Sequence, residues 1–355
     1  MDCHSSLGEP MVSGCLSSTS PRNSVLFSLG VSNSGKTHTL LGGRQESDMG
    51  LLPRVLMGLW RGERKIAGVK VRAVEVYNEM IYDLVREDQG AVAGSGEVCG
   101  APDEAKSGTK RKGKATDAAS GKVARFTRSS LSRRASTATS DSKPLSIRQE
   151  NGNFYVADMN CMDITDKETA LPRLFKCLES STKSHTEMNS SSSRGHTVVL
   201  LQPYGAGEGE QEEGDKDGDA VSASQEFGQI MVVDMAGLER TKKSQVYGTT
   251  MRESNKINQS IMRVLACLKI LKWNGEGRKQ KKLVPFRESK LTMLLQPVLS
   301  GPSDAIPTSV TMLLSVYEGG KDREEKAGLL REIEGLRGIK VPHKKEPIKS
   351  RYSVR

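Results

Sequence analysis

The sequence predicts an α/β fold with a central, mostly parallel twisted sheet and helices on both faces. The main observation is that segments with the period of strands alternate along the chain with segments of helical period. A second observation is a glycine-rich turn that joins an apolar strand to a helical segment, an arrangement that suits phosphate binding. Regular structure is expected from Asn23 onward, where the first continuous apolar run begins.

The individual elements follow from hydrophobic period. Strands are expected where the chain is continuously apolar or alternates every second residue, at 24–29, 69–77, 154–157, 197–203, 229–233 and 308–316. Helices are expected where apolar residues recur every three to four positions, at 51–62, 166–181, 253–272 and 288–299. Strands that alternate with helices in this way indicate a sheet packed on both faces.

Other segments lack apolar periodicity and are not expected to pack into the core. Residues 1–22 are predicted to be a disordered lead-in, 87–143 a disordered, basic, Ser/Thr-rich insertion, and 205–224 an acidic loop. Residues 342–355 form a basic tail, and the charged stretch before it, "EEKAGLLREIEGL", has the pattern of a short amphipathic helix. One folded domain is therefore expected over 23–341.

Composition limits the class of partner but does not choose one. Lys and Arg number 53 against 43 Asp and Glu, a net charge of +10 that suits an acidic partner such as nucleic acid, an anionic membrane or an acidic protein surface. The six cysteines show no metal-ligand spacing and are expected to be reduced thiols. No apolar run is long enough to span a bilayer and no secretory signal is recognisable, so we expect an intracellular protein without a membrane partner.

The glycine-rich turn is the pattern Gly30-x-x-x-x-Gly35-Lys36-Thr37, which follows an apolar strand as a phosphate loop requires. Backbone N–H groups would hold phosphate oxygens, Lys36 would neutralise their charge, and Thr37 would ligate Mg²⁺. Asn33 tolerates the positive φ that such a turn needs. The predicted nucleotide-binding residues are Gly30, Val31, Ser32, Asn33, Ser34, Gly35, Lys36, Thr37 and His38.

A second candidate element follows a later apolar strand in "GQIMVVDMAGLERTKK". Asp234 ends this strand, and a carboxylate in that position beside a phosphate loop is a typical outer-shell holder of Mg²⁺. Gly237 could offer its N–H to the terminal phosphate, and Glu239 follows it. The pattern D-x-x-G is weak alone but gains weight as a second phosphate element in the right order.

A third segment, "EMNSSSSRGHTVVLL", can be interpreted either as a serine-rich linker or as part of the same site. Beside two other phosphate elements, the hydroxyls of Ser192 and Ser193 could reach Mg²⁺ and phosphate. Arg194 could pair with Glu239 across the phosphate and close the site. The second interpretation therefore becomes the better one once the whole chain is considered.

The three segments resemble the phosphate loop, switch I (here Asn189 to His196) and switch II (here Asp234 to Arg240) of a kinesin motor domain. "VEVYNEMIYDLV" (74–85) is similar to a kinesin strand and helix, and "LVPFRESKLTMLL" (283–295) is similar to the family's "VPYRDSKLTRLL". The resemblance covers about residues 23 to 316 apart from the insertion. "LLPR", the "NINQS"-like sequence and the insertion are also similar to mitotic, cytokinesis-associated kinesins.

The resemblance implies a P-loop NTPase that hydrolyses ATP with Mg²⁺ and moves on microtubules. It implies Arg194, Glu239, Gly237 and Ser192 as the catalytic group and Thr37, Ser193 and Asp234 as the metal group. Implied partners are microtubules (tubulin) and a second copy of the chain, through regions not recognisable here. The implied location is the cytoplasm and the microtubule cytoskeleton, with the spindle as one site.

The long helix and the loop after it would form the track-binding face. The residues implied there are basic: Lys256, Arg263, Lys279, Lys281, Lys282, Arg287 and Lys290. The alternative for "RKQKK" is a solvated charged loop, and for the helix it is core packing through Ile257, Ile261, Leu265 and Leu268. We expect packing and track binding on opposite faces of the same helix.

The chain also departs from the family, which leaves alternatives open. Only 29 residues precede Gly30, so we expect either a divergent, N-terminally truncated member of the family or a fold that has lost part of its sheet. Gly195 and Leu238 replace switch serines, and the segment from Gly319 is a poor match to the family's final helix and neck. The alternative function is a non-motile microtubule-binding protein with weak or no ATPase. Nucleic-acid binding through 104–134 is not expected, because it rests on charge alone.

Overall fold

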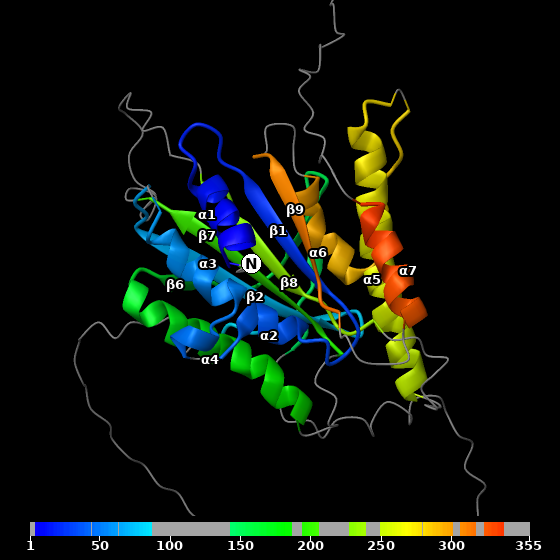
Figure 1. Cartoon of the computed structure of the whole chain (residues 1–355), viewed down its shortest axis with the longest axis horizontal. Coiled ribbons are helices and arrows are strands. Elements are labelled where there is room, and N and C mark those ends of the chain that lie inside the picture. The colour runs from blue at the N-terminus through cyan, green and yellow to red at the C-terminus, as the bar shows by residue number, and fades with distance from the viewer. Residues whose placement is uncertain are drawn as a thin grey trace, which may run out of the picture. The chain divides into compact units, whose positions relative to one another are not determined.

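A seven-stranded mixed sheet forms the centre of the described chain (Figure 1). The structure is a computed structural model that describes residues 4–43, 45–62, 64–86, 143–186, 194–205, 227–238, 249–278, 280–300, 306–316 and 323–336. The strand order is β3 (Met80–Asp83), β2 (Gly68–Tyr77), β7 (His196–Tyr204), β8 (Ile230–Asp234), β1 (Asn23–Leu29) and β9 (Thr308–Leu314), with β6 (Met162–Ile164) also paired to β2.

The strand that leads to the phosphate loop lies between two parallel neighbours. β1 pairs in parallel with β8 and β9, so that Phe27 lies opposite Val233 on one side and Met312 on the other. The pairings of β2 with β3, β6 and β7, and of β7 with β8, are antiparallel. The sheet of the predicted α/β fold is therefore mixed, and its parallel pairings are those of β1, where the phosphate loop begins.

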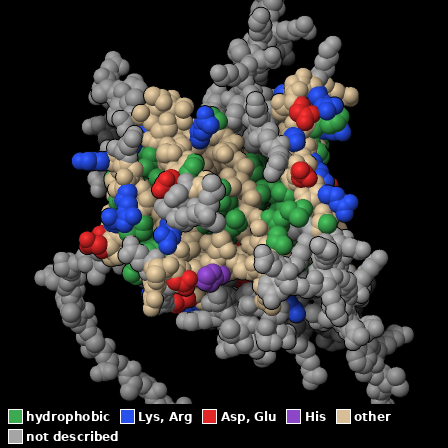
Figure 2. All heavy atoms as spheres, in the orientation of Figure 1, with side chains coloured by type: hydrophobic (Ala, Val, Ile, Leu, Met, Phe, Trp, Pro, Cys, Tyr) green, Lys and Arg blue, Asp and Glu red, His purple; other side chains and the backbone are tan. Residues whose placement is uncertain are grey.

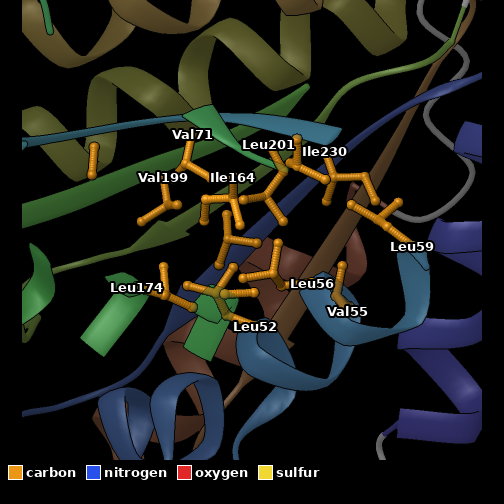
Figure 3. Close-up of a cluster of buried hydrophobic side chains, with 14 of the residues drawn as sticks. Leu52, Val55, Leu56, Leu59, Val71, Ile164, Leu174, Val199, Leu201 and Ile230 are labelled. Carbon is orange, nitrogen blue, oxygen red and sulfur yellow. The ribbon is translucent and has the colours of Figure 1, made fainter. Parts of the chain in front are cut away.

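One face of the sheet is covered by α1 (Glu9–Leu16), α3 (Leu51–Leu59) and α4 (Lys167–Thr186). Alternate strand residues point into this core, as Figure 3 shows for side chains of α3 and of several strands. The core on this face includes Leu52, Val55, Leu56, Leu59, Val71, Ile164, Leu174, Val199, Leu201 and Ile230. The short helix α2 (Lys36–Leu41) adds Leu40 to the same cluster.

The opposite face is covered by α5 (Thr249–Gly275) and α6 (Lys290–Leu299). The strand residues between those of the first core point here, so Phe27 and Val233 pack in one cluster with Ile261 and Leu268 of α5. Burial on both faces explains why the central strands read as continuous apolar runs. A small hairpin of β4 (Ile147–Glu150) and β5 (Asn153–Val156) contacts α6, where Gln296 Oε1 accepts a hydrogen bond from the Phe154 N–H at 3.0 Å.

The amphipathic segment near the C-terminus forms α7 (Arg323–Glu334), as predicted. Lys269 of α5 pairs with Glu332, and the Nζ of Lys272 donates a hydrogen bond to the Gly335 carbonyl at 2.9 Å. Figure 1 shows α7 beside α5, and Ile333 and Leu336 belong to the apolar cluster on that face. α7 therefore covers part of the helix that carries the predicted track-binding residues.

The prediction of a disordered lead-in over 1–22 was wrong for residues 4–16. A π-helical turn (His4–Gly8) leads into α1, whose Met11, Val12, Cys15 and Leu16 are buried against α3 and the sheet. The Cys15 thiol donates a hydrogen bond to the Gly228 carbonyl at 2.9 Å. The Ser and Gly residues between the apolar residues made the short apolar stripe of α1 hard to recognise in the sequence. The stability of this helix comes from tertiary packing rather than from helix propensity.

A second correction concerns 74–85, where a strand followed by a helix was expected. The chain instead makes a hairpin of β2 and β3, because Asn78 and Glu79 adopt positive φ values of 53° and 62° at its two-residue turn. Beyond the turn, Met80 is exposed and Ile81 is buried, which is the alternation of a strand. Asn and Glu mark this turn less clearly than the usual Asn-Gly pair does.

The other predicted strands and helices are confirmed, with boundaries that differ by a few residues. Most of the predicted insertion (87–142), most of the predicted acidic loop (206–224) and the basic tail lie outside the described residues. All described residues belong to one compact unit formed by 1–90 and 140–355. Within the described part, no helix is both long and apolar enough to cross a membrane.

Candidate nucleotide and track-binding site

The predicted phosphate loop joins β1 to α2 at the carboxyl end of β1, the strand between β8 and β9. β1 is buried throughout, and α2 begins at Lys36, so the turn lies at a fixed edge of the sheet. Asn33 has a φ of 60° and Gly35 one of 87°, which confirms the expectation that Asn33 takes the left-handed conformation. A loop of this shape turns its backbone N–H groups toward a common centre and favours an anion there.

Lys36 and Ser34 have the polar atoms that a phosphate would need. Lys36 is only 4% exposed, and its Nζ donates a hydrogen bond to the Val31 carbonyl of the same loop at 2.8 Å. Ser34 Oγ is buried and has no hydrogen-bond partner within the described residues. A bound anion would neutralise the buried Lys36 ammonium and would give the Ser34 hydroxyl a hydrogen-bond partner. These residues therefore fit a nucleotide phosphate.

Thr37 and Asp234 come together from distant parts of the chain. The Thr37 hydroxyl donates to Asp234 Oδ2 at 2.6 Å, and the Ser28 hydroxyl donates to Asp234 Oδ1 at 2.7 Å. Burial raises the pKa of the Asp234 carboxyl, while the hydrogen bonds from Thr37 and Ser28 and the charge of Lys36 oppose that rise. A hydroxyl beside a carboxylate offers the oxygen ligands that Mg²⁺ prefers, so the pair fits the metal implied by the sequence.

The segment after β8 is hydrogen-bonded to three separate elements. The N–H of Met235 donates to Ser28 Oγ of β1 at 3.2 Å, that of Ala236 donates to His196 Nδ1 at 3.0 Å, and that of Leu238 donates to the Gly30 carbonyl at 3.1 Å. Gly237 lies so close to the phosphate loop that an added Cβ would be 2.1 Å from Ser32 Oγ. The predicted second phosphate element is therefore in direct contact with the first.

The remaining predicted residues fall into three groups. Arg194 and Gly195 lie immediately before β7, while Ser192, Ser193 and Glu239 lie outside the described residues. His38 turns outward, with its Nε2 3.3 Å from Asp48 Oδ1 and its side chain 71% exposed. The structure thus gathers Gly30 to Thr37, Asp234 and Gly237 in one place, and it does not bring the His38 ring into the loop.

Ser28, His196 and Ser260 were missed as individual contributors. Ser28 is a buried polar residue within the apolar second half of β1, and His196 begins a strand with its side chain buried. His196 Nε2 lies 2.7 Å from the Ser260 hydroxyl of α5. A buried polar residue in an apolar run is the signal that could have marked the first two, but the sequence does not say which groups they contact.

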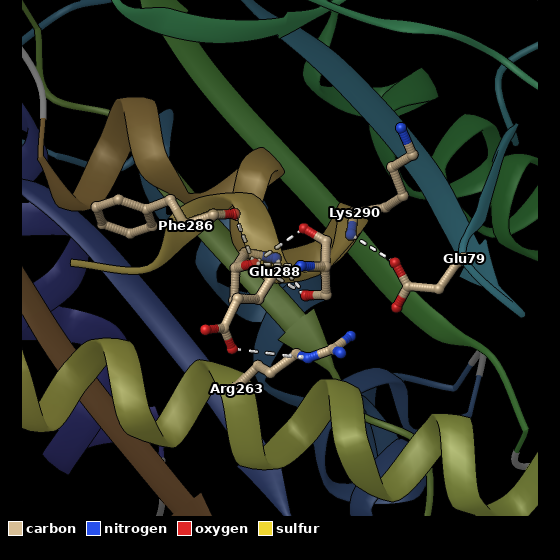
Figure 4. Close-up of polar contacts among 7 residues, drawn as sticks. Glu79, Arg263, Phe286, Glu288 and Lys290 are labelled. Carbon is tan, nitrogen blue, oxygen red and sulfur yellow. Dashed lines mark hydrogen bonds and ion pairs between the residues drawn. The ribbon is translucent and has the colours of Figure 1, made fainter. Parts of the chain in front are cut away.

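The predicted track-binding residues are distributed over α5, the following loop and the start of α6. The Nζ of Lys256 donates to Asn78 Oδ1 at 2.7 Å, and Arg263 Nε lies 3.8 Å from Glu288 Oε2 (Figure 4). The backbone N–H of Lys290 donates to Glu79 Oε2 at 2.8 Å, as Figure 4 also shows. The β2–β3 turn therefore contacts both α5 and the start of α6.

The loop after α5 presents cations and one apolar side chain to solvent. The guanidinium of Arg278 and the ammonium of Lys282 lie 3.5 Å and 4.0 Å from the centroid of the Trp273 ring. Asn274 holds the Lys282 backbone with hydrogen bonds to its N–H and carbonyl, both at 2.8 Å. Lys281 is exposed and Leu283 is 93% exposed, whereas Lys279 lies outside the described residues.

Arg287 of the 3₁₀ turn Phe286–Glu288 donates to Gln149 Oε1 of the β4–β5 hairpin at 2.6 Å. Figure 2 shows hydrophobic side chains grouped to the right of centre, between the positions of β9 and α5 in Figure 1, and others beside Lys and Arg side chains at the upper right. β9 is the last strand in the described order beyond β1, and its side chains are mostly half-buried.

A sequence profile of the Kinesin motor domain matches residues 2–327. The chain belongs to the kinesin motor-domain family. The match begins before the predicted domain boundary at residue 23, in agreement with the packing of α1 on the sheet.

Relatives and solved structures agree with this assignment. The kinesin-like protein KIN-14N of Oryza sativa subsp. japonica is 27% identical over 289 residues, which cover 79% of this chain and 30% of that protein. A fast kinesin gives a TM-score of 0.64 at 19% identity, covering 99% of this chain and 80% of that one. A KIF14 dimer with AMP-PNP in complex with a microtubule gives 0.63 at 20% identity, covering 97% and 79%.

The chain spans about 30% of the length of the curated relatives such as KIN-14N. At under 25% identity the solved structures establish the fold of this kinesin domain alone. The similarity to cytokinesis-associated kinesins stays a prediction.

Proposed function

We propose that this kinesin domain is an ATP-dependent microtubule motor, coupling MgATP hydrolysis to microtubule binding and movement. The observation that carries the proposal is the 2.6 Å hydrogen bond between Thr37 Oγ1 and Asp234 Oδ2. It places the hydroxyl of a phosphate loop against the carboxylate that ends a neighbouring strand, which is the arrangement of a Mg²⁺-nucleotide site. The microtubule complex of a KIF14 dimer with a similar fold supports the choice of track.

In this mechanism the chain's own groups act by position and charge. The loop amides and Lys36 hold the phosphates, and Lys36 exchanges its contact with the Val31 carbonyl for a phosphate oxygen. Thr37, Ser193 and Asp234 would hold Mg²⁺, which when bound neutralises charge on the phosphates. Arg194 and Glu239 would pair across the phosphate, with Ser192 and the Gly237 N–H beside them, and enclose the attacking water.

The basic residues of α5 and the loop after it would meet the acidic surface of tubulin. Lys256, Arg263, Lys279, Lys281, Lys282, Arg287 and Lys290 are the proposed contacts. The proposed location is the microtubule cytoskeleton of the cytoplasm, with the spindle as one site. Dimerisation is proposed through regions that are not recognisable in this sequence.

The test is ATP turnover by the purified chain with and without microtubules, with Lys36→Ala and Lys65→Ala compared with wild type. Lys65 is an exposed lysine before β2 and serves as the matched control. We expect microtubules to stimulate turnover in wild type and Lys65→Ala, and Lys36→Ala to lose turnover while remaining folded. Microtubule binding without stimulated turnover in a folded wild-type chain would instead establish the non-motile alternative.

A further inference from the structure

Three elements of the site meet at one buried imidazole. His196 begins β7 and is 3% exposed. Its Nδ1 accepts a hydrogen bond from the Ala236 N–H at 3.0 Å, and its Nε2 lies 2.7 Å from the Ser260 hydroxyl. Ala236 belongs to the segment after β8, and Ser260 belongs to α5. One side chain therefore connects the strand after Arg194, the loop that carries Gly237, and the helix that carries the basic residues.

The hydrogen bonds define a single arrangement of protons. Because Nδ1 accepts from a backbone N–H, the proton of a neutral ring is on Nε2, and that N–H donates to Ser260 Oγ. The Ser260 hydroxyl in turn donates to the Ile257 carbonyl at 2.7 Å. Burial lowers the pKa of His196 to about 4, so the ring is neutral at physiological pH. Every polar group in this chain of contacts is satisfied.

The hydrogen bonds of His196 and Ser260 lie in apolar surroundings. Val198, Val233 and Ile261 lie in the hydrophobic cluster on the same face of the sheet. A hydrogen-bonded connection in an apolar region is directional, whereas apolar contacts allow neighbouring elements to slide. Ser260 is buried, and the exposed Lys256 lies one helical turn before it along the same side of α5. Because the helix moves as one body, a shift at Ser260 also moves the basic side chains of α5.

We propose that His196 is a positioning residue that couples the loop after β8 to α5, so that nucleotide state at the phosphate loop sets the position of the basic helix. This role rests on the proposed motor function. The loop is also held by the Leu238 N–H on the Gly30 carbonyl, so a change at the phosphate loop reaches Ala236 within two residues. His196 then transfers the displacement to Ser260. It touches no reacting atom.

The first test uses a variant that removes the hydrogen bond between His196 and Ser260 of α5. Ser260→Ala keeps the His196 contact with Ala236 and removes the contact with α5. Thr308→Val is the matched control, because it also removes a buried hydroxyl, one that donates to the Val298 carbonyl at 2.7 Å outside this connection. Microtubule dissociation constants are measured by co-sedimentation in AMP-PNP and in ADP for the full chain. The ratio of the two constants measures the coupling.

We expect Ser260→Ala to reduce the ratio of the two dissociation constants by about threefold or more. Thr308→Val should lower the melting temperature about as much as Ser260→Ala does, but leave this ratio unchanged. Ser260→Thr, which keeps a hydroxyl, should restore most of the ratio. Equal ratios in wild type and Ser260→Ala would overturn the proposal. If wild type shows no nucleotide-dependent binding at all, the proposed motor function fails, and the connection is then decided by the next measurement.

That measurement needs no activity. In ¹⁵N-histidine spectra, His196 should be neutral with Nδ1 unprotonated, and Ser260→Ala should shift its Nε2 resonance. Backbone amide exchange should then rise in both α5 residues 257–268 and the Ala236 amide in Ser260→Ala, because the two are linked. Exchange changes confined to α5, or a His196 ring protonated on Nδ1, would overturn the proposal whether or not the chain hydrolyses ATP.

Discussion

Gly237 and Ser32 approach each other so closely that no side chain fits between them. A Cβ built on Gly237 would lie 2.1 Å from Ser32 Oγ and 2.8 Å from the Ser32 backbone nitrogen. The hydroxyl could rotate away, but the backbone nitrogen belongs to the phosphate loop and can move only with the loop. The close contact between the two phosphate elements of this kinesin domain therefore requires that residue 237 has no side chain.

Gly237→Ala should separate the two elements. We expect a loss of about 1–3 kcal/mol in the free energy of unfolding from the steric conflict, and a fall of at least about tenfold in ATP turnover because the loop contacts are displaced. Urea denaturation and steady-state turnover measure the two effects. Gly14→Ala is the control, since its added Cβ would meet only Arg22 Cβ at 3.7 Å. Normal turnover in Gly237→Ala would contradict the close contact.

The burial of His196 predicts how stability depends on pH. Its pKa is about 4 in the folded chain against 6.5 for the unperturbed group, so the unfolded chain binds more protons between these values. The stability contributed by the neutral ring is complete above pH 6.5 and is lost as the pH falls toward 4. The whole interval corresponds to about 3 kcal/mol, and about 2 kcal/mol of it should be lost by pH 5.

His196→Asn removes this titration and is the variant that tests it. Wild type should be more stable than His196→Asn at pH 7, and the difference between them should shrink by about 2 kcal/mol at pH 5. Urea unfolding at both values measures the difference while other titrating groups cancel. A difference that stays constant between pH 7 and pH 5 would show that His196 titrates normally in the folded chain.

The phosphate loop could be predicted from sequence because it is local. Consecutive backbone groups and Lys36 form the phosphate site, and even the left-handed conformation of Asn33 follows from its residue type. The connection through His196 joins residues 40 and 64 positions apart, and nothing in the local pattern says that the strand meets α5 there. Contacts of this kind depend on how sheet and helices pack, which hydrophobic period does not specify.

The same distinction explains the error at the N-terminus. The apolar residues of α1 are few and are separated by Ser and Gly, so a period is hard to detect over eight residues. What fixes the helix is long-range, because Val12 packs against Gly58 and Cys15 bonds to Gly228. The β2–β3 hairpin was missed for the opposite reason, since resemblance to a helix outweighed the local alternation of Met80 and Ile81.

A pair of adjacent substitutions tests whether α1 is part of the folded domain. Val12 is buried and Ser13 is exposed, so Val12→Asp places a carboxylate in the core and Ser13→Asp places one in water. We expect Val12→Asp to cost about 3 kcal/mol or more, and Ser13→Asp to change stability by less than about 0.5 kcal/mol. Thermal unfolding of both variants gives the comparison. Equal melting temperatures would restore the interpretation of a disordered lead-in.

The loop after α5 makes a prediction about salt. Lys281 is exposed, and among the described residues it has no ring contact like the one between Lys282 and Trp273, so its charge is available to an acidic track. Lys281→Glu should weaken microtubule binding by about threefold to tenfold at low ionic strength, and the effect should fade as salt is added because exposed charges are screened. Lys65→Glu makes the same charge change on an exposed lysine before β2. If both variants weaken binding equally, attraction depends on net charge alone, and the loop would lose its assignment as a specific contact.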